Sequence, residues 1–177
     1  MIMDKHSSGK SSLQLSGIAP ESFVDGPGIR YVIYTQGCFH KCPYCHNPES
    51  WEIDAGKEFS VREIIRLIKK HKKNIQGVTF SGGEPFLQAG ELAEIAQEVH
   101  QIDLDVVTYT GFTYEQLIEK NDVSVNALLF ASDILIDGKY IHELRSPTLQ
   151  FRGSSNQRII DIAQTQKTGE IKILSSL

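Results

Sequence analysis

The feature of this sequence that most limits its fold is a repeated alternation of short apolar runs with amphipathic segments. Four apolar runs are predicted to be strands: residues 31–35, 77–80, 105–109 and 133–137. The segments between them carry apolar residues at helical spacing, over residues 61–68, 92–99 and 114–118. Strands that alternate with helices favour a parallel sheet with right-handed crossovers. The alternation therefore predicts an α/β fold whose functional groups gather at the carboxyl ends of the strands.

Local signals indicate where two of these helices begin. Ser60 is a good N-cap and Glu63, three residues later, completes a capping box, while Thr113 caps the third helix. The sequence does not determine the secondary structure at the end of the chain as clearly. Residues 158–162 and 170–174 are both β-like, and their pattern does not settle how they pair.

Composition and charge exclude several classes of protein. The chain has 177 residues, of which 40% are hydrophobic and 23% charged, as in an ordinary globular domain. The polar residues 1–12 are predicted to be a flexible N-terminal tail, and residues 13–177 a single domain. A net charge of −4 with no long run of one sign argues against a nucleic-acid partner. No apolar run is long enough to span a membrane and no signal peptide is evident, so we expect a cytoplasmic protein without a membrane partner.

The three cysteines of the chain are its strongest chemical signal. Cys38, Cys42 and Cys45 follow the apolar run 31–35 directly, with the spacing C-x3-C-x2-C. An odd number of cysteines packed this closely cannot form a disulfide framework, so they indicate a metal or redox site. Residues 42–45 alone match a glutaredoxin-type redox pair, but that interpretation leaves Cys38 without a role.

Two kinds of metal site fit the cysteines. A zinc site would need His40 or His46 as the fourth ligand, and structural zinc sites usually draw paired ligands from two knuckles, of which this chain has one. A 4Fe–4S cluster normally takes four thiolates. Three thiolates leave one iron without a protein ligand, and an open coordination position is where a metal centre performs chemistry.

The cysteine spacing, with the aromatic Tyr44 before the last cysteine, resembles the radical S-adenosylmethionine (SAM) superfamily. Residues 81–85, Ser-Gly-Gly-Glu-Pro, are similar to the Gly-Gly-Glu motif of that superfamily, which binds the amino group of SAM. Glycines let the backbone approach a ligand closely, and a carboxylate pairs with an ammonium group. The resemblance implies that Cys38, Cys42 and Cys45 hold one 4Fe–4S cluster whose open iron is chelated by SAM. The cofactor-binding residues that it implies are Tyr44, Cys45, His46, Gly82, Gly83, Glu84 and Thr110.

Sequences on both sides of the cysteines narrow the resemblance. Residues 24–30 and 45–48 resemble the glycyl-radical-enzyme activating family, and residues 151–158 resemble the branch that activates anaerobic ribonucleoside-triphosphate reductase. The resemblance implies that Asp25 and Asn156 contact the substrate protein.

Two positions depart from the related activases of pyruvate formate-lyase. Those enzymes hold SAM with a strand-end aspartate and a late histidine, where this chain has Thr108 and Gln157. The departure leaves the roles of Thr108 and Gln157 open and favours the reductase branch.

The resemblance also implies a fold and a reaction. The fold is a partial, open (β/α) barrel, since a full barrel needs about 250 residues. Flavodoxin or ferredoxin supplies one electron, and SAM is cleaved to methionine and a 5′-deoxyadenosyl radical. This radical takes a hydrogen atom from a glycine of the catalytic subunit of the reductase.

Three alternatives stay open at this point. The first is a pyruvate formate-lyase-type activase. The second is a radical SAM enzyme for a small molecule, such as 7-carboxy-7-deazaguanine synthase. The third is a non-catalytic iron–sulfur or zinc module.

Overall fold

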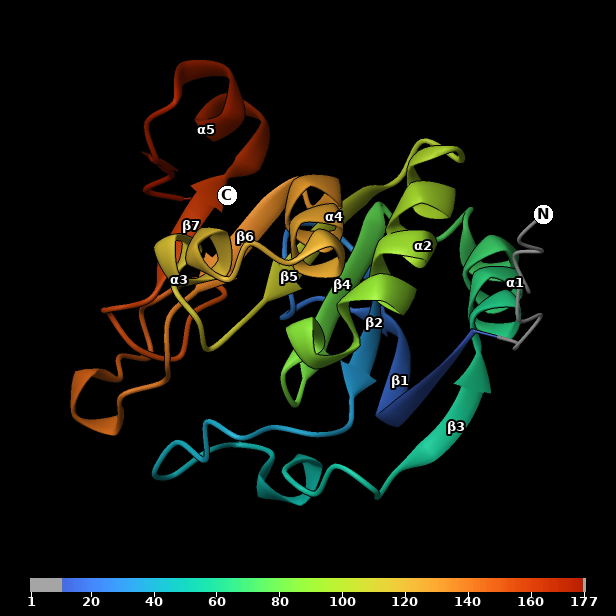
Figure 1. Cartoon of the computed structure of the whole chain (residues 1–177), viewed down its shortest axis with the longest axis horizontal. Coiled ribbons are helices and arrows are strands. Elements are labelled where there is room, and N and C mark those ends of the chain that lie inside the picture. Colours follow the sequence, from blue (N-terminus) through green and yellow to red (C-terminus); the bar gives the residue numbers. More distant parts are fainter. Residues whose placement is uncertain (1–10, 177) are drawn as a thin grey trace, which may run out of the picture.

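The computed structural model of the chain describes residues 11–176, which form an α/β structure built on one sheet (Figure 1). The sheet has eight strands in the order β3-β1-β2-β4-β5-β6-β7-β8. The strands are β1 (Ser12–Ser22), β2 (Arg30–Thr35), β3 (Lys57–Ser60), β4 (Gly77–Gly82), β5 (Asp105–Tyr109), β6 (Ile134–Asp137), β7 (Arg158–Asp161) and β8 (Lys172–Ile173). The α/β class predicted from the alternation is therefore confirmed.

The sheet is mixed rather than parallel throughout, which corrects the sequence prediction. Strands β2, β4, β5 and β6 run parallel to one another, as the helical crossovers between them require. At one end β1 pairs antiparallel with β2 and with β3, and at the other end β7 pairs antiparallel with β6 and with β8. Residues 23–29 are too short a connection for a parallel crossover, so β1 and β2 pair antiparallel.

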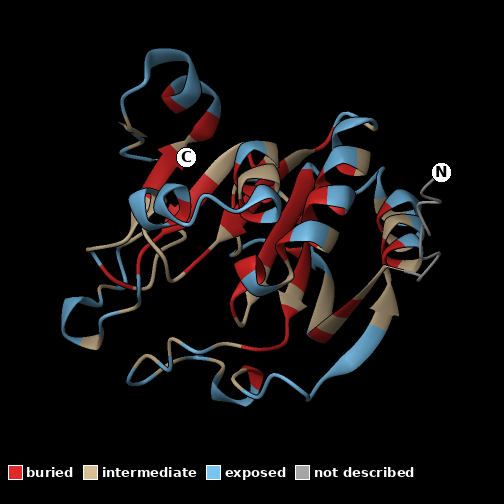
Figure 2. Cartoon of the chain, in the orientation of Figure 1, coloured by how far each residue is buried: buried red, intermediate tan, exposed pale blue. Residues whose placement is uncertain are grey.

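Five α-helices and three short 3-10 turns complete the described chain. The helices are α1 (Val61–His71), α2 (Ala89–His100), α3 (Tyr114–Glu119), α4 (Val123–Ala131) and α5 (Ile162–Thr168), and the turns are η1 (Pro48–Ser50), η2 (Pro85–Gln88) and η3 (His142–Leu144). Helices α1, α2 and α4 lie side by side against the sheet (Figure 1). Figure 2 shows the central strands buried and the outer sides of these helices exposed.

The two faces of the sheet have different cores, because successive side chains of a strand point to opposite faces. Tyr31, Phe80 and Val106 belong to the large core beneath the helices. On the other face, Val107 and its neighbours Ile136 and Ile159 form a small separate cluster. This second face lacks a helical layer among the described residues, which leaves room for a site at its carboxyl edge.

The helix starts follow the predicted caps. The Ser60 hydroxyl accepts a hydrogen bond of 3.2 Å from the Glu63 backbone N–H, which is one of the two bonds of the predicted capping box; the reciprocal bond from the Glu63 side chain is not formed. Thr113 and Gln116 form a complete capping box at the start of α3. Among residues 11–176 no helix is long and apolar enough to cross a membrane.

The ends of the chain differ in detail from the sequence predictions. Residues 1–10 of the expected tail lie outside the described residues, and β1 already begins at Ser12. The β-like run 158–162 divides into β7 and the start of α5, and the run 170–174 contributes only the short strand β8. The pairing that the pattern left undecided is antiparallel, with Ile160 opposite Ile173.

Candidate functional site

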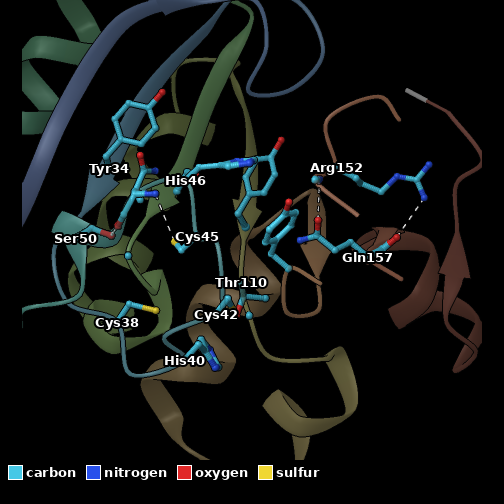
Figure 3. Close-up of a pocket in the computed structure, with 18 of the residues that line it drawn as sticks. Tyr34, Cys38, His40, Cys42, Cys45, His46, Ser50, Thr110, Arg152 and Gln157 are labelled. Atoms are coloured by element: carbon cyan, nitrogen blue, oxygen red, sulfur yellow. Dashed lines mark hydrogen bonds between the residues drawn. The ribbon is translucent and has the colours of Figure 1, made fainter. Parts of the chain in front are cut away.

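A cavity of about 550 Å³ opens at the carboxyl ends of the parallel strands (Figure 3). Tyr34 from β2, Gly82 from β4, Tyr109 from β5 and Gly138 after β6 all line it. The expectation that polar loops after successive strands meet at one edge is therefore confirmed. The three cysteines open into this same cavity.

The cysteine loop, residues 38–47, lies between β2 and η1. Its curvature depends on backbone conformations that residues other than glycine rarely adopt, with φ of +45° at Lys41 and +58° at Tyr44. The Cys38 backbone N–H donates to the Trp51 carbonyl at 3.1 Å, and the Cys45 N–H donates to the Cys42 carbonyl at 3.1 Å. These bonds hold the loop in a tight coil that turns its thiols toward the cavity.

The cysteine thiols have the environment of metal ligands rather than of disulfide partners. All three are free and half-buried. Burial raises the pKa of the Cys38 thiol, against an opposing hydrogen bond from the His40 backbone, and burial raises the pKa of Cys42 in the same way. The Asn47 N–H donates to the Cys45 sulfur at 3.4 Å. Buried thiols that accept N–H hydrogen bonds are suited to become thiolates when a cation binds them.

The donor set fits a 4Fe–4S cluster. In the described part of the chain, no three His, Cys, Asp or Glu side chains converge on a point where a single metal ion would bind. A 4Fe–4S cluster makes no such demand, because each thiolate binds a different iron. Cys38, Cys42 and Cys45 would hold three of the irons, and the fourth would face the cavity.

The Gly82–Gly83 turn forms the wall of the cavity next to the cysteine loop. Gly83 donates its backbone N–H to the Thr35 carbonyl at 2.8 Å. A Cβ atom on Gly83 would collide with the Gly37 carbonyl, and one on Gly82 would lie 2.5 Å from the Thr35 nitrogen. Both glycines are therefore needed, first of all, for close packing of the turn against the segment that enters the cysteine loop.

Glu84 lies apart from the cavity surface. The sequence predicts that its carboxylate faces an ammonium group, but the side chain is fully buried and does not belong to the cavity lining. The carboxylate accepts hydrogen bonds from the His40 ring at 2.8 Å, from the Thr110 hydroxyl at 2.9 Å and from the backbone N–H groups of Gly111 and Phe86 at 2.9 and 3.0 Å. Its direct contact with SAM stays a prediction.

The other predicted cofactor residues divide into two groups. Thr110 and His46 line the cavity, and their contact with a cofactor stays a prediction. Tyr44 does not line the cavity: the residue is 71% exposed, and its ring packs on the ring of His142 with 4.3 Å between centroids.

Asp25 lines the cavity on the wall formed by the β1–β2 connection. Ser22 and Tyr34 both donate to Oδ2 of its carboxylate, at 2.5 and 3.1 Å, and the Thr79 hydroxyl donates to its backbone carbonyl at 2.8 Å. Burial, followed by the charge of Asp25, raises the pKa of Tyr34 to about 12. Burial also raises the pKa of Tyr109, which lines the same cavity. Both phenols are therefore protonated at neutral pH.

Asn156, predicted to contact a substrate protein, is not among the residues that line the cavity. Its amide group donates to the Lys139 carbonyl at 2.8 Å. The neighbouring Gln157 lines the cavity instead. Its Oε1 accepts a hydrogen bond from the Gly153 N–H at 2.8 Å, and its Nε2 donates one to the Gly138 carbonyl at 3.0 Å. Thr108 lies on the helix-covered face, where its hydroxyl is 2.7 Å from that of Ser132.

Sequence reasoning missed the first part of the connection between β6 and β7, residues 139–150, which forms the third wall together with residues 151–157. The backbone of Tyr140 acts on the Cys42 thiol, where its hydrogen bonding opposes the rise in pKa caused by burial, and the Tyr140 ring packs 5.1 Å from the ring of His46. The Tyr140 hydroxyl is 3.1 Å from Nδ1 of His142. The local signal for residues 139–150 is Gly138, which follows an apolar strand directly.

A sheet that presents three free cysteines in one loop at its carboxyl edge defines an α/β protein built around a single iron–sulfur cluster. Comparison with known proteins agrees, because a family described as "4Fe-4S single cluster domain" matches residues 24–160. Anaerobic ribonucleoside-triphosphate reductase-activating proteins are similar over most of the chain. The one from Vibrio cholerae is 34% identical over 148 residues, covering 79% of this chain and 92% of the relative.

Two further relatives carry the same name. The protein of Haemophilus influenzae is 36% identical over 147 residues, which are 79% of this chain and 92% of the relative. The protein of enterobacteria phage T4 is 35% identical over 148 residues, which are 80% of this chain and 90% of the relative. The chain therefore belongs to the family of anaerobic ribonucleoside-triphosphate reductase-activating proteins.

Proposed function

We propose that this chain activates an anaerobic ribonucleoside-triphosphate reductase by generating a glycyl radical on its catalytic subunit. The observation that carries the proposal is one cavity that brings together three cysteine thiols, the Gly82–Gly83 turn and the Asp25 carboxylate. The names of the relatives support the reductase as the partner. When bound, the reduced 4Fe–4S cluster supplies the electron that cleaves SAM, and the cleavage provides the hydrogen-abstracting species.

The residues of the chain bind and orient the reactants. Cys38, Cys42 and Cys45 hold the cluster, and the Gly82–Gly83 backbone offers carbonyl groups to the ammonium group of SAM. Thr110 and His46 line the adjacent wall. A carbon-centred radical attacks nearly any C–H bond, so selectivity has to come from holding one C–H bond within reach and excluding other donors.

Asp25 is suited to hold the partner's glycine segment. The hydrogen bonds that it accepts from Ser22 and Tyr34 both end on Oδ2. Oδ1 is thus left for a backbone N–H group of an incoming peptide. Val24, which lies next to it on the cavity wall, is 76% exposed and gives the incoming segment an apolar contact.

The architecture suits a protein substrate. We propose that the strands form an open, partial (β/α) barrel within a single domain of residues 13–177. Strands β3 and β8 end the sheet, and the described chain does not close it between them. An unclosed side gives a protein loop a route to the cavity, which a small substrate would not need.

The reductant and the compartment follow from the same chemistry. A flavodoxin or ferredoxin is the proposed electron donor, because the cluster needs one electron at low potential. The cytoplasm is the proposed location, since three free thiols are stable in a reducing compartment.

A direct experiment tests the function. The protein, reconstituted with iron and sulfide without oxygen, is mixed with the reductase, SAM and dithionite, and the EPR spectrum is recorded. A glycyl-radical doublet that depends on all three additions is expected. SAM cleavage without any radical on the reductase would refute this assignment and favour a small-molecule enzyme or another activase.

A further inference from the structure

The carboxylate of Glu84 joins three segments that surround the cavity. One oxygen accepts from the ring Nε2 of His40, in the cysteine loop, at 2.8 Å. The carboxylate also accepts from the Thr110 hydroxyl at 2.9 Å and from the Gly111 N–H at 2.9 Å, both in the turn after β5. Because Glu84 itself follows β4, these bonds tie the cysteine loop to the ends of two neighbouring strands.

The backbone of Glu84 holds the same loop on the other side of Cys38. The Glu84 N–H donates to the Gly37 carbonyl at 2.8 Å. Gly37 immediately precedes Cys38, and His40 follows it by two residues. A single residue therefore fixes the first cysteine from both directions, through its backbone and through its side chain.

The His40 ring is enclosed, so its contact with Glu84 is not an incidental surface pair. The side chains of His40 and Glu84 are 5% and 0% exposed. The ring packs against Phe39 and Phe112, with centroids 4.9 and 4.7 Å away. A Cβ atom on Gly111 would lie 2.7 Å from Nε2 of His40, so the ring rests directly on the backbone of that glycine.

We propose that the His40–Glu84 pair is a latch that fixes the cysteine loop against the Gly82–Gly83 turn and Thr110. In this proposal His40 is a positioning residue for both the cluster and SAM. The inference rests on the proposed function, because it assumes that a cluster and SAM share this cavity. It gives Glu84 a role different from that of an ammonium ligand. Figure 3 shows His40 on the same side of the cavity as Cys38, Cys42 and Thr110.

The latch has a physical reason to matter. The loop carries all three cysteines that would hold the cluster, while the Gly82–Gly83 turn, which is proposed to bind the ammonium group, lies at the end of β4. Their relative position therefore has to be set by contacts between the two segments. A buried carboxylate that accepts charge-assisted bonds is a strong connector, because losing a donor leaves the charge undersatisfied.

Three variants test the latch on the reconstituted protein without the reductase. His40→Leu removes the donor, His40→Gln keeps an amide N–H near the position of Nε2, and Gly111→Ala displaces the ring without altering the carboxylate. The readouts are the rate of cluster loss to a ferrous chelator, followed by absorbance, and the SAM affinity by calorimetry. For His40→Leu and Gly111→Ala we expect about tenfold to hundredfold faster loss and weaker SAM binding, the range for a hydrogen bond to a charged group. His40→Gln should return both values to within about threefold of wild type.

His100→Leu is the matched control. His100 pairs with Asp133 at 3.0 Å, but both side chains are half-exposed and lie away from the cavity. This variant should lose its cluster at the wild-type rate, and circular dichroism should show every variant folded.

Equal rates of cluster loss in wild type, His40→Leu and Gly111→Ala would overturn the latch. So would weaker SAM binding in Glu84→Gln with no change in His40→Leu, since Glu84 would then serve SAM directly. Neither assay contains the reductase. A failed latch therefore stays distinct from a failed activase function, which would appear as a missing glycyl radical with the wild-type protein.

Discussion

The hydroxyl of Tyr34, on β2, donates a hydrogen bond of 3.1 Å to Oδ2 of Asp25, in the connection that precedes that strand. The same oxygen accepts from Ser22 at 2.5 Å. Two donors on one oxygen fix the rotation of the carboxylate and direct the other oxygen away from them. The proposed contact with the substrate glycine thus depends on an orientation that Tyr34 and Ser22 maintain together.

We predict that Asp25→Ala separates SAM cleavage from radical formation on the reductase. The cysteine loop and the Gly82–Gly83 turn are segments separate from the β1–β2 connection that carries Asp25, so dithionite-driven cleavage of SAM should continue. The glycyl radical should fall by tenfold or more, an order of magnitude expected when a reacting group is no longer held within reach. The comparison uses one preparation, with 5′-deoxyadenosine measured by chromatography and radical spins by EPR.

Tyr34→Phe provides the graded comparison for that prediction. It removes one of the two donors to Oδ2 and leaves Ser22 in place, so the radical yield should fall less than in Asp25→Ala. Proportional loss of 5′-deoxyadenosine and radical in Asp25→Ala would instead place Asp25 in SAM binding. A full radical yield would remove it from the site.

A second prediction concerns the cluster ligands. Each of Cys38→Ala, Cys42→Ala and Cys45→Ala should abolish SAM cleavage, because three thiolates are the whole protein ligand set. The wild-type protein should take up about four irons per chain on anaerobic reconstitution and turn brown. Iron and sulfide analysis checks both statements. Zinc retained in place of iron after anaerobic purification would contradict them.

A third prediction concerns Gly83, whose surroundings change the expectation drawn from sequence. The sequence assigns this glycine to the close approach of a ligand to the backbone. Instead, a Cβ atom would meet the Gly37 carbonyl next to Cys38. Gly83→Ala should therefore lower both iron incorporation and stability, the latter by about 1–3 kcal/mol, as overpacking does.

Gly90→Ala is the control for Gly83→Ala. Gly90 lies in α2, where an added Cβ would find its nearest neighbour, Ser124, at 3.5 Å. Replacing a helical glycine by alanine should raise stability by about 0.5–1 kcal/mol, the opposite sign. Iron content and urea unfolding of both variants would test the pair, and normal iron incorporation in Gly83→Ala would disprove the packing argument.

Much of the sheet could be predicted because its central strands are buried on both faces and read as apolar runs. Strand β1 was missed because only its first half has clear alternation, at Leu13 and Leu15, before Pro20 and Glu21. Helix α4 was missed because its apolar residues are too many rather than too few. Its residues, Val123–Ala131, are so uniformly apolar that no helical period stands out.

The cysteine ligands were predictable because their chemistry is carried by residue type and local spacing. The contacts that organise them are not local. Tyr140 reaches Cys42, and His40 reaches Glu84, only through the arrangement of the strands. The carboxylate of Glu84 shows most clearly what local sequence cannot predict. Its motif indicates a contact with a ligand, but the carboxylate is buried because it accepts hydrogen bonds from the turn after β5. Residue type predicted which chemistry is present, whereas tertiary packing decides which groups face the cavity.

The last prediction concerns an ion-pair group whose residues do not line the cavity. Arg158 on β7 donates to both oxygens of Glu115 at 3.0 and 2.7 Å and also binds the buried Asp137 on β6. The hydrogen bonds from Arg158 lower the pKa of Glu115 to about 2, from 4.5. A carboxyl group with a lowered pKa in the folded state adds stability above its unfolded pKa. That stability is lost as the pH falls from about 4.5 through about 2, because the unfolded state then binds more protons.

Glu115→Gln should therefore lower the free energy of unfolding at pH 6 but change it less at pH 3. The side chain of Glu115 is 49% exposed, so solvent limits the effect to about 1 kcal/mol or less. Urea unfolding of the metal-free protein between pH 6 and pH 3 measures the difference between wild type and variant. Glu119→Gln, on the same helix and without an ion pair among the described residues, is the control and should give a difference that does not shrink at low pH. A constant wild-type-to-Glu115→Gln difference across this range would show that Arg158 does not hold Glu115 in its charged form.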